Sequence, residues 1–108
     1  MWIFSQSAFV SIVEDRNDPG TLIVRARIQG DIERLWPDAE VRHTPMADYA
    51  YRAALSRQEV AAGIAKEVLE IHYNNYKNSI PDKRRSPFYM MVWDAMWRMQ
   101  NEMWIRPR

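Results

Sequence analysis

The stretch that decides the fold is Asp15-Arg16-Asn17-Asp18-Pro19-Gly20 followed by Thr21-Leu22-Ile23-Val24-Arg25-Ala26-Arg27-Ile28. Its first half is a dense turn signal, because proline presets φ and glycine is free to take a positive φ. Its second half is apolar and β-branched, as strands are. Residues 8–13, which read A-F-V-S-I-V, have the same character. The two segments therefore predict a β-hairpin closed by residues 15–20.

The second strand of this hairpin has two different faces. Side chains alternate along a strand, so Val24, Ala26 and Ile28 share one face while Arg25 and Arg27 share the other. One face of the predicted sheet then belongs to the core. The opposite face presents two guanidinium groups.

The flanking segments extend the hairpin into an α+β fold. Ser56 and Glu59 form a capping-box pair that predicts the start of a helix at residue 56, running to about residue 72. In that helix the apolar stripe is Val60, Ile64, Val68 and Ile71. The other predicted elements are a first strand over 2–13 that breaks near 5–7, a short helix over 30–36 with Asp31 as its N-cap or first-turn acid, strands over 39–43 and 49–55, and a last helix from Ser86. The order is ββαββαα, typical of a small antiparallel sheet with helices packed on one face.

The totals limit the class of protein. A length of 108 residues predicts a single domain over 1–108, with a basic loop at 74–85 and a short tail at 105–108. The net charge of +1 is too small to attract the protein as a whole to nucleic acid or anionic lipid. There is no cysteine and no apolar run near the ~18 residues of a membrane span, so we expect a cytoplasmic protein without a membrane partner.

The last helix is apolar over more of its circumference than one core needs. At 100° per residue its side chains form two adjoining groups. The first group is expected to close the core against the sheet: Phe88, Val92, Met96, Met99 and Met103. The second group is an aromatic stripe: Tyr89, Trp93, Trp97 and Trp104. Trp and Met are common both in protein cores and in interfaces. The stripe is therefore either part of the core or a partner-binding surface. The simplest partner for such a surface is a second copy of the chain.

A second candidate surface is basic. Four bases against one acid lie between residues 77 and 85, next to aromatic side chains. Bases interleaved with aromatics can neutralise phosphates and stack on bases, although a solvated loop is the more common role. The nucleic-acid or anion-binding set is Arg25, Arg27, Tyr76, Lys77, Lys83, Arg84 and Arg85. Arg42 and Arg52 enlarge it if they project from the uncovered face of the sheet.

Signals for catalysis are weak. His43 and His72 lie on different elements without metal-ligand spacing, and the three glycines form no phosphate-binding loop. Acids occur in pairs at Glu14-Asp15 and at Asp31 with Glu33, where they usually cap helices and solvate turns. We therefore expect no catalytic residue, no metal and no cofactor. A small enzyme acting on an anionic substrate remains the weakest alternative.

Five segments carry a resemblance: residues 1–4 (MWIF), 24–27 (VRAR), 48–52 (DYAYR), 73–77 (YNNYK) and 92–97 (VWDAMW). In this order they resemble a family of small uncharacterised proteins in bacteria and their phages, over nearly the whole chain. No activity is known for that family, and this chain departs from it in the basic loop and the tail. Small domains of phages and mobile elements often bind and block a host protein, such as a defence component, and the resemblance implies that role.

The sequence as a whole favours a non-enzymatic protein-interaction module. Its expected partner-binding residues are Tyr89, Trp93, Trp97 and Trp104, which would act as aromatic anchors toward another protein or a second copy. Nucleic-acid binding through the basic set is the alternative.

Overall fold

A computed structural model describes residues 1–105 of the chain. Of Ile105, it describes the backbone but not the side chain. These residues belong to two compact units, Met1–His72 and the part that begins at Tyr73, which are described separately below. The α+β fold class is confirmed. The expectation of one domain over 1–108 stays a prediction. Residues 106–108 of the expected tail lie outside the described residues.

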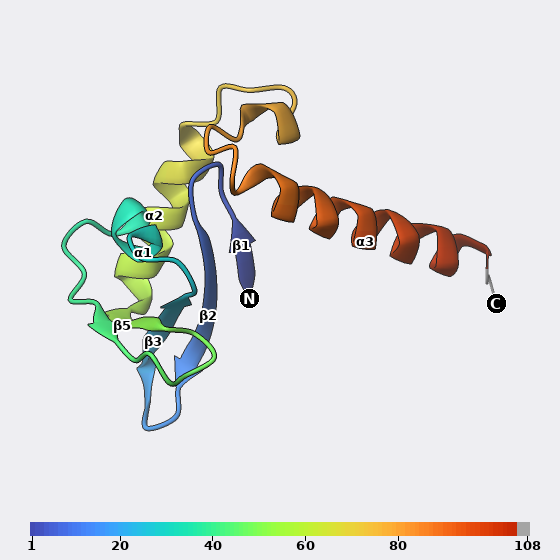
Figure 1. The fold of residues 1–108 in the computed structure, drawn as a ribbon. Coiled ribbons are helices and arrows are strands. Elements are labelled where there is room, and N and C mark those ends of the chain that lie inside the picture. The colour runs from blue at the N-terminus through green and yellow to red at the C-terminus, as the bar shows by residue number, and fades with distance from the viewer. Residues whose placement is uncertain (106–108) are drawn as a thin grey trace. The chain divides into compact units, whose positions relative to one another are not determined.

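The first unit is built on a five-stranded antiparallel sheet (Figure 1). Its strands, in spatial order, are β1 (Trp2–Phe4), β2 (Phe9–Asp15), β3 (Asp18–Ala26), β5 (Tyr51–Ser56) and β4 (Arg42–His43). The expected break near 5–7 is confirmed. There the Ser5 hydroxyl accepts a hydrogen bond from the Ala8 N–H at 3.0 Å, which turns the chain from β1 into β2.

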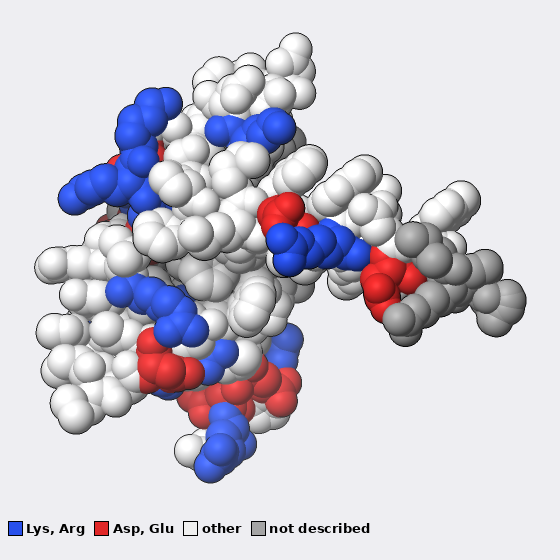
Figure 2. All heavy atoms as spheres, turned by 45° about the vertical axis from the view of Figure 1, so that its right-hand side comes forward, with Lys and Arg blue, Asp and Glu red and all other residues white. Residues whose placement is uncertain are grey.

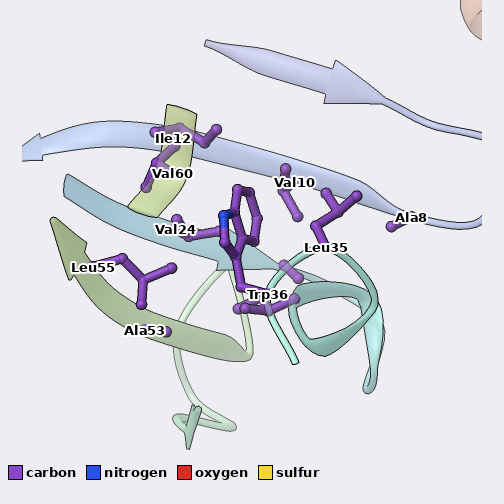
Figure 3. Close-up of a cluster of buried hydrophobic side chains, with 11 residues drawn as sticks. Ala8, Val10, Ile12, Val24, Leu35, Trp36, Ala53, Leu55 and Val60 are labelled. Carbon is purple, nitrogen blue, oxygen red and sulfur yellow. The ribbon is translucent and has the colours of Figure 1, made fainter. Parts of the chain in front are cut away.

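Two helices, α1 (Asp31–Leu35) and α2 (Arg57–Leu69), cover one face of this sheet (Figure 1). The core lies between them and the strands, with Trp36 at its centre (Figure 3). The Trp36 indole N–H donates to the Glu59 carbonyl oxygen at 2.9 Å, which joins the end of α1 to the start of α2. The predicted alternation of β3 is confirmed for Val24 and Ala26, which are fully buried.

The start of α2 agrees with the helix start predicted from the sequence. The Ser56 hydroxyl accepts from the Glu59 N–H, and the Glu59 carboxylate accepts from the Ser56 N–H, so the predicted capping box is present. The apolar stripe of α2 extends less far than expected. Val60 is buried and Ile64 packs at the edge of the core, but Val68 is 58% exposed, because the core cluster reaches along α2 only to Ile64.

The hairpin turn is shorter than the sequence suggested. Asp15 pairs with Asp18, so only Arg16 and Asn17 form the turn, while Pro19 and Gly20 lie inside β3. The Asp18 carboxylate accepts from the Thr21 hydroxyl and the Gly20 N–H, and these hydrogen bonds lower the pKa of Asp18. The expectation of a turn over 15–20 was therefore wrong in its extent.

The entry to α1 agrees with one of the two roles expected for Asp31, that of a first-turn acid. Gly30 is the N-cap residue, with a φ of 94° that favours glycine. Asp31 is buried, and its carboxylate accepts from the Phe9 N–H at 3.0 Å. Asp31 is thus a first-turn acid of α1 and also connects the helix to the start of β2.

The second unit contains a 3₁₀ helix, η1 (Lys77–Ser79), and a long helix, α3 (Ser86–Ile105), which begins where the sequence predicts. Tyr76 and Tyr89 stack with ring centroids 6.2 Å apart and connect the loop to the helix. Burial raises the pKa of Tyr76 well above its usual value, with smaller contributions from the neighbouring Tyr89 and Tyr73. No helix in the described part of the chain has the length and apolarity needed to cross a membrane.

The expectation that α3 closes the core was wrong. The core cluster of the sheet and the side chains packed against it come from residues 3–64, because α1, Trp36 and α2 already cover the apolar face. The side chains assigned to closing the core are largely exposed: Phe88 is 65% and Met103 69% accessible, and Met96 and Met99 are about half accessible. Of that group, Val92 alone is half-buried.

Candidate binding surfaces

The sheet face opposite α1 and α2 carries a row of arginines. Arg25 of β3 lies directly opposite Arg52 of β5, and Arg52 lies directly opposite Arg42 of β4. Residues paired in this way point to the same face and are about 5 Å apart between neighbouring strands. The register therefore confirms the conditional expectation that Arg42 and Arg52 share a face with Arg25. We call Arg25, Arg52 and Arg42 the arginine row.

Tyr49 orients two guanidinium groups on this face. The Arg25 guanidinium lies 4.5 Å and the Arg27 guanidinium 4.2 Å from the centre of the Tyr49 ring. Arg25 also donates to the Ser11 hydroxyl at 2.6 Å, and Arg27 donates to the Asp48 carbonyl oxygen at 2.7 Å. Both guanidinium groups are thus held by a ring that is itself buried, which lowers the entropy lost when they bind an anion.

The position of Tyr49 differs from the simple alternation of a strand over 49–55. Such alternation would place Tyr49, Tyr51 and Ala53 on one face. The strand β5 begins only at Tyr51, so strict alternation does not apply to Tyr49. Its ring contacts arginines of the open face, while Tyr51 packs against the core.

Positive charge on this face is poorly compensated. Asp48 pairs with Arg52 at 3.3 Å, and within residues 1–105 no other carboxylate forms an ion pair with Arg25, Arg27, Arg42 or Arg52. The Nε atom of Arg25 is buried and has no hydrogen-bond partner. Like charges placed directly opposite each other destabilise a sheet. An arrangement that costs stability in this way is typical of a binding site.

Aromatic rings occupy the other end of the same face. Trp2 of β1 is paired with Ser11, and Ser11 is paired with Arg25, so Trp2 continues the line of the arginine row across the sheet. The Trp2 ring meets Phe9 edge-on at 6.0 Å, and Phe9 stacks on Phe4 at 4.4 Å. Trp2 is 66% exposed, so most of its ring is accessible.

The second candidate surface is α3. Figure 2 shows it mainly without charge, apart from acidic and basic side chains along one side. The charged strip contains Asp94, paired with Arg98 at 3.1 Å, and the sequence adds Glu102 one turn later. Trp93 and Trp97 stack on each other at 6.0 Å, and Trp104 is 82% exposed. Of the expected stripe, Tyr89 is buried and the three tryptophans are exposed.

The basic loop and the aromatic stripe are in contact within this unit. The Lys77 ammonium lies 5.0 Å from the centre of the Trp93 ring, and the Arg85 guanidinium lies 5.9 Å from that of Tyr89. Lys83 and Arg84 are exposed. Asp82 accepts from the Arg84 N–H at 2.8 Å, and this hydrogen bond lowers the pKa of Asp82. Lys77 and Trp93 therefore belong to one surface.

The expected nucleic-acid set is divided between the two units. Arg25 and Arg27 belong to the sheet, whereas Tyr76, Lys77, Lys83, Arg84 and Arg85 belong to the second unit. The sequence did not indicate that Trp2, Ser11 and Tyr49 belong to the sheet face that carries the arginine row. The period-two pattern of β1 contained a signal for Trp2, but the Tyr49 contact depends on a loop conformation that no local pattern encodes.

Two of the residues considered for catalysis contact neighbouring side chains. His43 stacks on Tyr51 with ring centroids 4.8 Å apart, and Glu14 pairs with Arg57. Within residues 1–105, no group of three His, Asp or Glu side chains is placed to hold a metal ion.

Comparison of the chain with models of known protein families, with curated proteins and with solved structures found no significant match.

Proposed function

We propose that this protein is a non-enzymatic interaction module that binds a protein partner through α3. The observation that carries the proposal is the exposure of Trp93, Trp97 and Trp104 on one side of a helix of 20 residues. Exposed apolar patches of this kind typically mark interaction sites, and tryptophan is enriched among the residues that dominate binding energy. The stacked Trp93–Trp97 pair presents a preformed flat surface.

A second copy of the chain is the simplest partner for this surface, because a two-fold symmetric dimer would pack the tryptophans of one copy against those of the other. At 100° per residue, Arg98 and Glu102 lie about 120° and 160° around the helix from the centre of the three tryptophans. These charged side chains would therefore stay in solvent in such a dimer.

A different protein can use the same surface. The resemblance to bacterial and phage proteins makes a host protein, such as a defence component, the proposed hetero-partner, with the cytoplasm as the place of action. In that case the tryptophans would fill pockets of the host protein and block its surface.

The test is substitution of Trp97 in the full chain. We expect Trp97→Ala to weaken self-association at least about ten-fold, because hot-spot truncations cost about 2 kcal/mol or more. Sedimentation equilibrium measures the association constant, and far-UV circular dichroism verifies that the fold is retained. The matched control is Met91→Ala, which removes an exposed apolar side chain from the side of α3 away from the Trp97 ring.

The result distinguishes the two partner types. A concentration-dependent dimer that Trp97→Ala dissociates supports the second copy. A monomeric wild-type chain that forms a stoichiometric complex with a purified host protein, lost in Trp97→Ala and kept in Met91→Ala, supports the hetero-partner. Equal effects of the two substitutions, or loss of the fold in Trp97→Ala, would overturn the proposal.

A further inference from the structure

We propose that the open face of the sheet is a binding site for single-stranded nucleic acid, independent of the proposal for α3. The site combines the arginine row with Arg27 and Trp2. All of these residues belong to the first unit, so the site is complete without any residue from residue 73 onward.

The dimensions of the face suit a short single strand. Trp2, Ser11, Arg25, Arg52 and Arg42 form one continuous line of paired residues across all five strands. At 4.7–4.9 Å between strands this line is about 19 Å long. It has an aromatic ring at one end and guanidinium groups at the other. A strand of a few nucleotides lying along it would place a base on Trp2 and phosphates over the arginines.

The chemistry of the face matches a phosphate backbone better than a protein carboxylate. Guanidinium groups bind phosphate in a bidentate manner, and an acidic peptide would use them equally well. An acidic peptide, however, would leave Trp2 without a role. Base stacking on exposed aromatic rings, next to a basic track on an antiparallel sheet, is a recurrent mode of single-strand recognition.

The arginines are organised before any ligand binds. Tyr49 and Ser11 hold Arg25, while Tyr49 and the Asp48 carbonyl oxygen hold Arg27. Within residues 1–105, the one carboxylate that forms an ion pair with these arginines is that of Asp48, which pairs with Arg52. Three positive charges therefore remain in excess on this face.

The experiment is fluorescence anisotropy of a labelled oligothymidylate, about ten nucleotides long, titrated with the full chain at several salt concentrations. Binding should weaken with salt, with a log–log slope near −0.7 for each phosphate neutralised. The double variant Arg42→Gln/Arg52→Gln should lose at least about ten-fold in affinity and reduce that slope by about 1.4. Trp2→Ala should lose about ten-fold with an unchanged slope, because it removes stacking and no charge.

The matched control is Arg34→Gln, an exposed arginine of α1 on the helix-covered side of the first unit. It removes the same charge from the same unit and should change affinity by less than about two-fold. Far-UV circular dichroism of each variant verifies the fold. A second control, Lys83→Gln/Arg84→Gln, removes two exposed charges of the basic loop and should likewise leave binding nearly unchanged.

Four results would overturn the proposal. The first is the absence of binding at low salt, and the second is an equal loss in Arg34→Gln. The third is loss of binding in the loop variant without loss in the arginine-row variant, which would place the site in the second unit. The fourth is displacement of the oligonucleotide by polyglutamate at equal or lower charge concentration, which would assign the face to an acidic protein segment.

Discussion

Replacing Trp36 with alanine is expected to lower the free energy of unfolding of the first unit by about 3–5 kcal/mol. Trp36 is only 6% exposed, and its ring lies between α1, α2 and the central strands (Figure 3). The substitution removes the largest side chain of the core and the hydrogen bond to Glu59. The free energy of unfolding of ordinary domains is about 5–15 kcal/mol, so the substitution would remove much of the stability of the first unit.

Urea denaturation followed by far-UV circular dichroism measures the loss. The matched control is Trp2→Ala, which removes the same side chain from an exposed position and should change the free energy of unfolding by less than about 1 kcal/mol. Similar losses in the two variants would contradict the assignment of Trp36 to the core.

The substitution Gly63→Ala is expected to destabilise the protein by about 2–3 kcal/mol. Replacing glycine with alanine inside an exposed helix normally stabilises it by about 1 kcal/mol. Here a Cβ atom would lie 2.2 Å from Nε1 and 2.8 Å from Cδ1 of Trp36. Gly63 is therefore required by the close packing of α2 on the indole ring. A loss of stability in Gly63→Ala indicates close packing against the indole ring, whereas a gain would indicate that helix propensity dominates.

A double-mutant cycle identifies the indole as the cause. In the Trp36→Phe background, which lacks the Nε1 atom, the cost of Gly63→Ala should shrink by at least about 1 kcal/mol. Thermal or urea unfolding of the four proteins provides the coupling energy. Stabilisation by Gly63→Ala in the wild-type background, or no coupling to residue 36, would disprove the contact.

The parts of the fold that sequence predicts are those controlled by short-range chemistry. The capping box at Ser56 and Glu59 and the alternation along β3 depend on neighbouring residues, and both are confirmed. The sequence did not identify Arg16 and Asn17 as the two residues of the hairpin turn. Pro19 and Gly20 are strong turn formers, but in this protein they lie within β3. Composition therefore placed the hairpin correctly but extended its turn three residues too far, to Gly20.

The parts that sequence did not predict depend on what covers each surface. The helical periodicity of residues 86–104 identifies α3 but cannot tell a buried apolar face from an exposed one. That distinction depends on whether another element already covers the sheet, as α1, Trp36 and α2 do. The arginine row likewise required a strand register, because a shift of one residue would send Arg42 or Arg52 to the opposite face.

The central claim is that the core of the first unit is complete without α3, which leaves the tryptophans of α3 for a partner. The most direct measurement is urea denaturation of a chain that ends at His72, compared with the full chain. Since the core cluster comes from residues before 65, the shortened chain should unfold cooperatively, with a free energy of unfolding within about 1 kcal/mol of the first unit in the full chain. A shortened chain that is unfolded in buffer would show that α3 belongs to the core, and would contradict the account.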